Sequence, residues 1–315
     1  MPEADSRLKT LGLAVVCGGP GAEREVSLAS GGCACDALLE GGFRVEKAIV
    51  PPEAPEQFIE ALNCDVAVMM LHGEFGEDGH AQRILERRSL PFTGSSSEVC
   101  ALSMDKDACK RLFARSDIPT PRWVLLDKAA GAEKAIAEAG LDIPLVVKPN
   151  GRGSSVGVSI VRKRRDLPAA LELAFGLDGR ILAEEFVEGR ELTVGWLDGR
   201  ILPVIELVPD DGFYDYQAKY ISDKTIYLCP AELPDDVEAD ISLIVRKTAE
   251  IIPVRDLARV DIILGRDGPR VLEINVLPGF TTHSLVPLAA RRVGLEMPAL
   301  CEKLVEMAAR RGGLP

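Results

Sequence analysis

Residues 259–275, RVDIILGRDGPRVLEIN, decide the fold of the chain around them. Two apolar runs typical of strands flank a cluster of Gly, Asp and Pro, which predicts a β-hairpin with a loop of about five residues. A hairpin centred on the middle of this cluster puts Arg259 opposite Asn275. The same register puts Asp261 opposite Glu273. Alternate side chains of a strand share a face, so all four are predicted to lie on one side of the hairpin.

This polar face is unfavourable as a structure but suits a metal ion. Two carboxylates directly opposite each other on neighbouring strands repel. Asp261, Glu273 and Asn275 together offer the oxygen ligands that a hard cation such as Mg²⁺ prefers. A hairpin with one solvated charged face would show the same alternation, so these residues alone leave both interpretations open. The other face is predicted to face the core and is purely apolar: Val260, Ile262, Leu272 and Ile274.

The length and the amino-acid composition are those of an ordinary soluble protein. Hydrophobic residues make up 47% and charged residues 27% of the 315 residues, a length that predicts two or three domains. No apolar run reaches the roughly 20 residues of a membrane-spanning helix, and the polar first residues are not a secretion signal. We therefore expect a cytoplasmic protein that does not bind membranes. The net charge of -12 argues against a general nucleic-acid binder.

Residues 1–103 are predicted to form a domain with a doubly wound parallel sheet, because apolar strand-like runs alternate with helical patterns. Such a sheet binds ligands beyond the carboxyl ends of its strands. Glu23 follows one predicted strand and a glycine turn, and His72 follows another and opens a glycine-rich loop. Both are candidates for a substrate site, although the helix dipole alone also favours an acid in a first turn. The predicted strands span residues 11–17, 43–50 and 65–71.

Residues 104–188 are predicted to form a second domain around a glycine-rich loop. The loop NGRGSSVG, residues 150–157, joins one strand to another strand. It lacks the sequence GxxxxGK[ST], and no helix begins directly after it, so it is not a P-loop. A mobile hairpin that closes over phosphates fits better, with Lys148 on the preceding strand as the cation. A flexible surface hairpin without function is the alternative.

Residues 189–315 contain the hairpin and a second candidate lid. All four tyrosines of the chain lie between residues 214 and 227. Aromatic side chains concentrated in a loop suggest a lid over a site, and a packed loop with no part in the chemistry is the alternative. Residues 285–309 have an amphipathic helical pattern and are predicted to serve packing only.

Seven motifs resemble the D-alanine:D-alanine ligases of the ATP-grasp superfamily, in the right order and spacing over residues 11–305. The resemblance implies an N-terminal α/β domain with a parallel sheet, followed by a two-lobed ATP-grasp fold of α+β type. The motifs are GGPGAEREVS at residues 18–27, LHGEFGED at 71–78, SMDK at 103–106, GSSVG at 153–157, YDYQAKY at 214–220, CPA at 229–231 and EINVLPG at 273–279.

The resemblance also implies an activity and its cofactors. It implies the ATP-dependent joining of two D-alanines into D-alanyl-D-alanine for peptidoglycan, through a D-alanyl phosphate. Two Mg²⁺ ions, with Mn²⁺ as the other possibility, would bind Asp261, Glu273 and Asn275. The small-molecule substrates would be D-alanine and ATP, and the family suggests a homodimer.

The other site residues follow from the resemblance, position by position. Lys106 and Lys148 would contact ATP phosphates, and Lys219 the phosphoryl group in transfer. Glu184 would contact the adenine and Glu191 the ribose. The further nucleotide-binding positions are Ser154, Ser155, Glu185 and Val187.

The same comparison names the substrate-binding and catalytic positions. Glu23 would bind the ammonium of the first D-alanine, with His72 near its carboxyl end. Ser284 would receive the carboxylate of the second D-alanine. The positions for oxyanion stabilisation are Arg259 and the N–H of Gly279, and a hydrogen-bonded bridge would join Glu23, Ser154 and Tyr220.

Two other functions fit parts of the pattern. A D-alanine:D-lactate or D-alanine:D-serine ligase would share the fold, and Tyr220 stands at the position that the family ties to dipeptide formation. A non-catalytic ATP-binding regulator would lack a metal ligand or an oxyanion donor, and none is missing. A few positions depart from the usual pattern, which affects fine contacts only: Pro20, Gly21, Arg152 and Val276.

Overall fold

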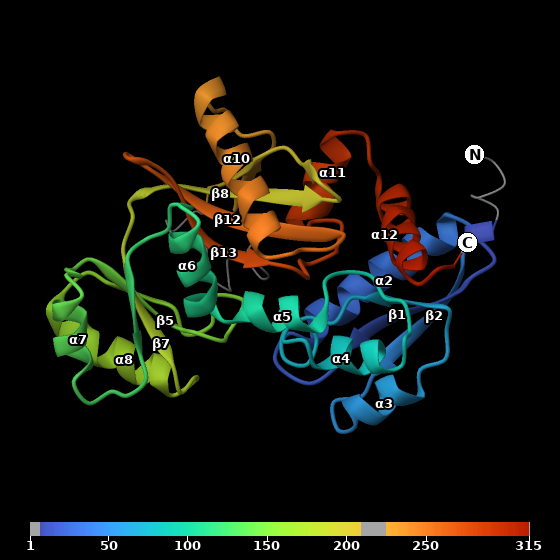
Figure 1. Cartoon of the computed structure of the whole chain (residues 1–315), viewed down its shortest axis with the longest axis horizontal. Coiled ribbons are helices and arrows are strands. Elements are labelled where there is room, and N and C mark those ends of the chain that lie inside the picture. The colour runs from blue at the N-terminus through green and yellow to red at the C-terminus, as the bar shows by residue number, and fades with distance from the viewer. Residues whose placement is uncertain (1–6, 209–224, 315) are drawn as a thin grey trace.

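The computed structural model describes residues 7–208 and 225–314, and within them three β-sheets organise the chain (Figure 1). The first sheet has the strand order β2-β1-β3, and all its pairs are parallel. Its central strand is buried on both sides, which explains its continuous apolar sequence. The three strands are β1 (Gly12–Gly18), β2 (Arg44–Val50) and β3 (Val66–Met69).

Helices cover both faces of the first sheet. Alternate β1 side chains pack into two separate cores, one with α2 (Arg24–Glu40) and one with α3 (Pro55–Ala61) and α4 (His80–Arg87). This confirms the predicted doubly wound sheet. Because β2 and β3 lie on opposite sides of β1, the topological switch point falls between the ends of β1 and β3. Glu23 and His72 follow these two strand ends.

The second sheet is antiparallel, with the strand order β4-β7-β5-β6. Helices α7 (Ala132–Glu138) and α8 (Leu167–Phe175) share a core with it. A short 3-10 turn (Arg164–Asp166) precedes α8. Because β5 pairs directly with β6, the glycine-rich loop joins strand to strand, as predicted. The strands are β4 (Trp123–Leu126), β5 (Leu145–Pro149), β6 (Ser159–Val161) and β7 (Ile181–Glu185).

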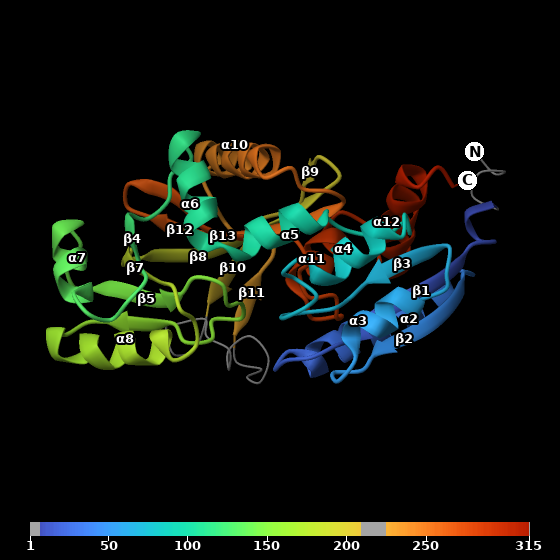
Figure 2. The same cartoon turned by 60° about the horizontal axis from the view of Figure 1, so that its bottom comes forward.

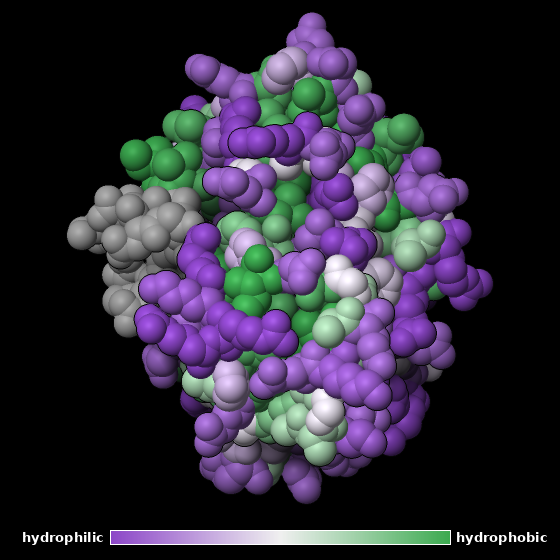
Figure 3. All heavy atoms as spheres, turned by 90° about the vertical axis from the view of Figure 1, so that its left-hand side faces the viewer, coloured by the Kyte–Doolittle hydropathy of each residue, from purple (hydrophilic) through white to green (hydrophobic). Residues whose placement is uncertain are grey.

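Figure 3 views the molecule from the end that carries α7 and α8. Hydrophilic side chains cover most of this face, and hydrophobic side chains show near its centre. Helix α7 buries Ala132 and Ile136 and exposes Glu133, Lys134 and Glu138, as an amphipathic surface helix does, whereas α8 also exposes Leu173.

The third sheet has the strand order β11-β10-β8-β12-β13, and β9 pairs with β8. Helices α5 (Ser97–Met104), α6 (Lys106–Arg115) and α10 (Asp235–Ile251) share its core and lie together on one side of it in Figure 2. The strands are β8 (Gly189–Leu197), β9 (Arg200–Ile201), β10 (Ile205–Val208), β11 (Ile226–Leu228), β12 (Leu257–Gly265) and β13 (Gly268–Asn275).

The β12–β13 hairpin confirms the predicted register at its polar face. Arg259 pairs with Asn275, and Asp261 pairs with Glu273. The predicted five-residue loop is wrong, because Gly265 pairs with Gly268 and leaves only two residues in the turn.

A β-bulge reconciles the short turn with the predicted register. The pairing shifts between Asp261 and Ile262, which pairs with Val271, so Leu272 is the extra residue. Val271 is fully buried, whereas Leu272 is only partly buried and lines a cavity. The prediction that Leu272 faces the core is therefore wrong.

The C-terminal helical pattern of residues 285–309 forms two helices. Helix α11 (Leu285–Arg292) ends before Gly294, which has the left-handed φ of 79°. Helix α12 (Met297–Arg311) then begins with a proline in its first turn. The break lets α12 turn back onto α2 and share the core of the first sheet (Figure 1). The domain boundaries at residues 103 and 188 stay predictions.

Candidate active site

Two neighbouring cavities lie along the third sheet, with volumes of about 530 Å³ and 710 Å³. The first is bounded by the second sheet and the third, and the second reaches the loops after β1 and β3. Lys106 and Glu273 line both cavities. A group held between these two side chains would therefore contact both spaces.

The first cavity brings together the side chains predicted for ATP. Apolar groups, including Val146, Ile263 and Leu272, form part of its wall and suit a flat aromatic base. Asp261 of the predicted metal face also lines it. The predicted nucleotide residues on its wall are Lys106, Lys148, Ser155, Glu184, Glu185, Val187 and Glu191.

The second cavity brings together the side chains predicted for D-alanine and for oxyanion stabilisation. Two of the predicted residues, Lys219 and Tyr220, lie outside the described residues. The predicted residues on the wall of this cavity are Glu23, His72, Ser154, Arg259, Asn275, Gly279 and Ser284.

A buried charge network stands at the inner end of the first cavity. Glu184 has 2% of its surface exposed, and its Oε1 lies 3.1 Å from the Nζ of Lys148. Its Oε2 lies 2.9 Å from the Nζ of Lys110, a residue with no exposed surface. Lys110 also donates hydrogen bonds to Thr120 Oγ1 (2.6 Å) and to the carbonyl oxygen of Pro121 (3.1 Å). Two lysines thus compensate one buried carboxylate.

The two partners of this network respond to burial differently. Burial lowers the pKa of Lys110 to about 8, although Glu184 opposes the shift. Burial by itself would raise the pKa of Glu184, but Lys110 and Lys148 outweigh it and hold that pKa below its ordinary value. The carboxylate is therefore ionised at neutral pH. The side chain of Lys148 lines the cavity.

The predicted metal ligands lie on one face, among positive charges. Arg259 makes two hydrogen bonds of 2.8 Å to the two oxygens of Asp261. Thr193 Oγ1 donates to Asp261 Oδ1 over 2.6 Å. Glu273 Oε2 lies 3.6 Å from Lys106 Nζ. The repulsion between the opposed carboxylates is thus relieved by cations here.

Asn275 completes the polar face with an amide oxygen. Its Oδ1 accepts a hydrogen bond of 2.8 Å from the N–H of Leu277. Within residues 7–208 and 225–314, no three His, Cys, Asp or Glu side chains gather into a metal site. The predicted set has only two such side chains, Asp261 and Glu273, and completes its donors with an amide.

Glu23 contacts the glycine-rich loop directly, through a hydrogen bond from Ser154 Oγ. Gly73 makes room for this carboxylate, because a Cβ at that position would lie 2.3 Å from Glu23 Oε2. Ser154 itself has a left-handed φ of 53°. The first two members of the predicted bridge therefore meet, and the third, Tyr220, lies outside the described residues.

His72 is buried and held from both sides. Its Nδ1 lies 3.4 Å from Glu77 Oε1, and its Nε2 lies 3.0 Å from Ser30 Oγ. Ser30 Oγ also accepts a hydrogen bond of 3.1 Å from the N–H of Phe280. Ser30 therefore connects the histidine of the first domain to the loop that carries Gly279.

The loop after β13 is compact around Gly279. A Cβ at Gly279 would lie 3.1 Å from Ser284 Oγ, so a larger residue would displace that hydroxyl. Ser284 Oγ accepts a 2.9 Å hydrogen bond from the N–H of Thr281 and lies 2.9 Å from Thr281 Oγ1. Ser284 is also the N-cap residue of α11. One turn of the chain therefore positions both the hydroxyl of Ser284 and the backbone of Gly279.

Sequence reasoning missed several of these contacts. Lys110 lies four residues after Lys106, and two like charges at that helical spacing repel. The pattern could have indicated that an anion meets this helix face. Ser30 lies seven residues after Glu23, on the same face of a helix. Thr193 carries no comparable signal.

Known proteins have similar sequences and the same architecture. Residues 112–306 match the family described as D-ala D-ala ligase C-terminus. A D-alanine–D-alanine ligase of Aromatoleum aromaticum is 43% identical over 297 residues, which cover 94% of this chain and 95% of that protein.

Solved structures agree with this comparison. The D-alanine–D-alanine ligase from Bacillus anthracis complexed with ATP has a TM-score of 0.84 and 28% identity, covering 96% of this chain and 99% of that one. The VanG D-Ala:D-Ser ligase from Enterococcus faecalis has a TM-score of 0.82 and 27% identity, covering 95% and 99%. By sequence and fold, this chain belongs to the D-alanine–D-alanine ligase family.

Proposed function

We propose that this chain joins two molecules of D-alanine into D-alanyl-D-alanine for peptidoglycan, using ATP and passing through D-alanyl phosphate. One observation carries the proposal: the cavity with the predicted nucleotide residues and the cavity with the predicted amino-acid residues share Lys106 and Glu273. A phosphoryl group at this junction can pass from a nucleotide in one cavity to a carboxylate in the other. The named relatives and the Bacillus anthracis complex with ATP support the same reading.

In the first step, positively charged side chains reduce the repulsion between the phosphates of ATP and the attacking carboxylate. Lys148 and Lys106 would bind ATP phosphates, and Glu184 and Glu191 would bind the adenine and the ribose. Glu23 would hold the ammonium of the first D-alanine at the end of the second cavity. Neutralising both anions allows the carboxylate to approach the γ-phosphoryl group.

The polar face of the β12–β13 hairpin fits a divalent cation. Asp261, Glu273 and Asn275 share one face and offer carboxylate and amide oxygens, which suit Mg²⁺ and also Mn²⁺. Bound metal would supply charge neutralisation at the phosphates. We propose two Mg²⁺ ions at this face.

In the second step, the amine of the second D-alanine attacks the carbonyl carbon of the acyl phosphate, an oxyanion forms, and its collapse breaks the C–O bond and releases phosphate. Arg259 and the N–H of Gly279 would stabilise the oxyanion, and a preorganised donor of this kind contributes on the order of 3 kcal/mol. Ser284 would hold the carboxylate of the second D-alanine. The glycine-rich loop over Glu23 would keep water from the acyl phosphate.

The test is phosphate release from ATP by the purified protein with Mg²⁺, with products identified by mass. We expect release that depends on D-alanine, does not occur with L-alanine, and gives D-alanyl-D-alanine. ATP binding without D-alanine-dependent release would contradict the proposal and favour a regulator.

The same assay separates the related ligases. D-lactate or D-serine is added together with D-alanine, and the mass of the product shows which second substrate is used. We expect the dipeptide of D-alanine to dominate at neutral pH. If a depsipeptide or D-alanyl-D-serine dominates, the proposed second substrate is wrong, but the reaction class is unchanged.

We propose a cytoplasmic homodimer, on the basis of the family resemblance. None of the helices in the described ranges is both long and apolar enough to cross a membrane. Sedimentation of the purified protein tests the dimer, and a monomer at micromolar concentration would contradict it.

A further inference from the structure

Asn150 is a buried residue at the root of the glycine-rich loop, and all its polar groups are bonded. It has 1% of its surface exposed. Its Oδ1 accepts from the N–H of Asp107 (2.8 Å), and its Nδ2 donates to Asp105 Oδ1 (3.0 Å). Its carbonyl oxygen accepts from the N–H of Lys106 (3.3 Å), and its N–H donates to the carbonyl oxygen of Arg180 (3.0 Å). Three of these four bonds hold the N-terminus of α6.

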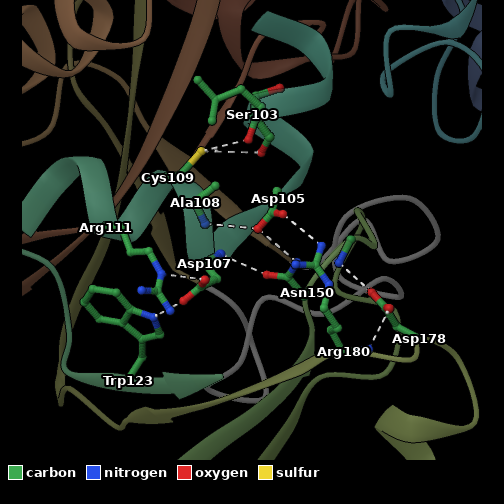
Figure 4. A network of polar contacts seen from close by, with 12 residues as sticks. Ser103, Asp105, Asp107, Ala108, Cys109, Arg111, Trp123, Asn150, Asp178 and Arg180 are labelled. Atoms are coloured by element: carbon green, nitrogen blue, oxygen red, sulfur yellow. Dashed lines mark hydrogen bonds and ion pairs between the residues drawn. The ribbon is translucent and has the colours of Figure 1, made fainter. Parts of the chain in front are cut away.

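Asp105 is the other centre of this network (Figure 4). It is the N-cap of α6 and accepts a hydrogen bond of 3.0 Å from the N–H of Ala108. Arg180 adds a charged hydrogen bond of 2.8 Å to its second oxygen. Burial by itself would raise the pKa of Asp105, but the bonds from Ala108, Asn150 and Arg180 outweigh it and lower that pKa. The carboxylate is therefore ionised when it binds Asn150.

The network also fixes the first residues of the loop itself. The N–H of Gly151 donates to Asp178 Oδ2 over 2.6 Å. Arg152 Nε donates to the carbonyl oxygen of Leu177 over 3.2 Å. Figure 4 shows Asp178 and Arg180 beside Asn150, opposite the start of α6. Residues 150–152 are thus tied down on both sides, whereas the contact with Glu23 comes later, at Ser154.

The position of Asn150 relates it to both predicted phosphate lysines. Lys148 lies two residues earlier on β5, and Lys106 is the first residue of α6, which Asn150 holds. Lys106 Nζ donates in turn to the carbonyl oxygen of Arg152 in the loop (2.7 Å). The side chain of Asn150 therefore sets the distance between the two lysines and the starting point of the loop.

We propose that Asn150, bound to Asp105 and through it to Arg180, is a positioning residue that aligns Lys106, Lys148 and the root of the glycine-rich loop for the triphosphate of ATP. The proposal rests on the proposed function, since it assigns the triphosphate to this junction. Asn150 acts through the two lysines and the loop and does not touch the reacting atoms. Because a displacement of about 1 Å costs on the order of 100-fold in such a site, a small loosening is measurable.

The first experiment compares the wild type with Asn150→Ala. We expect the KM for ATP to rise about tenfold and the KM for D-alanine to change less than about threefold, because Glu23 and Arg259 lie outside the network. We also expect more than one phosphate released per dipeptide, since a misplaced loop admits water to the acyl phosphate. An unchanged KM for ATP together with one phosphate released per dipeptide would overturn the proposal.

Two further variants separate positioning from folding. Leu171→Ala opens the core beneath the second sheet without touching the network, so it should lower stability but leave both KM values and the phosphate released per dipeptide unchanged. Arg180→Ala removes only the hydrogen bond from the half-exposed guanidinium of Arg180 to Asp105. It should fold, and it should raise the KM for ATP by about threefold. The proposal is contradicted if Leu171→Ala raises the KM for ATP as much as Asn150→Ala, or if Arg180→Ala leaves it unchanged.

A last measurement does not depend on the reaction. Trypsin cleavage after Arg152, followed by mass spectrometry without ligands, reports how firmly the root of the loop is held. Asn150→Ala should be cut there several-fold faster than the wild type and Leu171→Ala. Equal rates would overturn the proposal, whereas a wild type that makes no dipeptide but shows the difference in cleavage would overturn only the proposed function.

Discussion

At the scale of single residues, two fully buried polar side chains support the site without being part of any motif. Ser30 joins His72 to the N–H of Phe280, and Lys110 holds the second oxygen of Glu184. Both have no exposed surface. A buried polar group costs free energy unless it is bonded, so each of these contacts constrains its partners.

Replacing Ser30 should slow the chemical step. Ser30→Ala leaves the N–H of Phe280 without its acceptor, so the neighbouring N–H of Gly279 loses its fixed direction. We expect kcat for dipeptide formation to fall at least about tenfold, with a smaller change in the KM for ATP. Steady-state kinetics checks this.

The matched control for Ser30→Ala is Ser27→Ala in the same helix. Ser27 is equally buried and bonds backbone at the ends of β1 and β3. Both variants should lose about 1 to 3 kcal/mol of stability, but only the change at Ser30 should lower kcat strongly. Equal effects on kcat would mean that Ser30 acts through stability alone.

Lys110 should make stability depend on pH in the alkaline range. Its pKa is about 8 in the folded chain and 10.5 when unperturbed, so the folded chain binds fewer protons between these values. The free energy of unfolding contributed by this group therefore rises with pH across that window, by up to roughly 3 kcal/mol. Urea unfolding of the wild type and Lys110→Met from pH 7 upward measures the difference. A difference that does not change with pH would contradict the assignment.

At the scale of elements, the glycine-rich loop and the β12–β13 hairpin each depend on local backbone geometry. The hairpin keeps its four polar side chains on one face only because the bulge at Leu272 compensates the two-residue turn. The loop closes at Gly157, which has a φ of 75°. Both features are decided by single residues within their elements.

Gly157→Ala should weaken ATP binding by displacing the end of the loop. A Cβ there would lie 2.4 Å from Leu177 and 3.0 Å from Pro149. Gly131 is a matched control, because its φ is 84° and its Cβ would meet nothing within 4 Å. Both substitutions carry about 1 to 2 kcal/mol of backbone strain, but only Gly157→Ala should raise the KM for ATP, about tenfold. Similar kinetics for the two variants would show that loop placement is not limiting.

At the scale of the whole molecule, one ion pair connects three segments that are far apart in the sequence. Asp256, just before β12, is 4% exposed and accepts a hydrogen bond of 2.7 Å from the N–H of Gly94. Arg311 in α12 binds Asp256 and also donates to the carbonyl oxygen of Phe92 over 2.9 Å. The first sheet, the third sheet and the last helix meet at this pair.

Breaking this pair should destabilise the whole chain. Asp256→Ala and Arg311→Ala should each lower the free energy of unfolding by roughly 3 kcal/mol. Arg311→Ala leaves the buried carboxylate of Asp256 without its cation, and Asp256→Ala leaves Arg311 and the buried N–H of Gly94 without their acceptor. The double variant should lose little more than either single one, since the same contact is removed once. Denaturant unfolding of the four proteins measures this cycle. Fully additive losses would show that the two side chains act independently.

The sequence by itself determined the fold class, the strand-to-strand nature of the glycine-rich loop, and the register of the hairpin at its polar face. Each of these depends on periodicity or on turn residues, which neighbouring positions reveal. The same local information explains why Glu23 and His72 could be placed at strand ends. It also carried the seven motifs from which the family was identified.

Only the tertiary structure decided the partners of the buried polar groups. Nothing near Asn150 in the sequence indicates that its amide holds α6, and nothing near Ser30 indicates Phe280, 250 residues away. The bulge that moves Leu272 out of the core and the break that turns α12 back onto α2 were also missed. The physical reason is that these contacts are fixed by packing between distant segments, which adds free energy that no local pattern records.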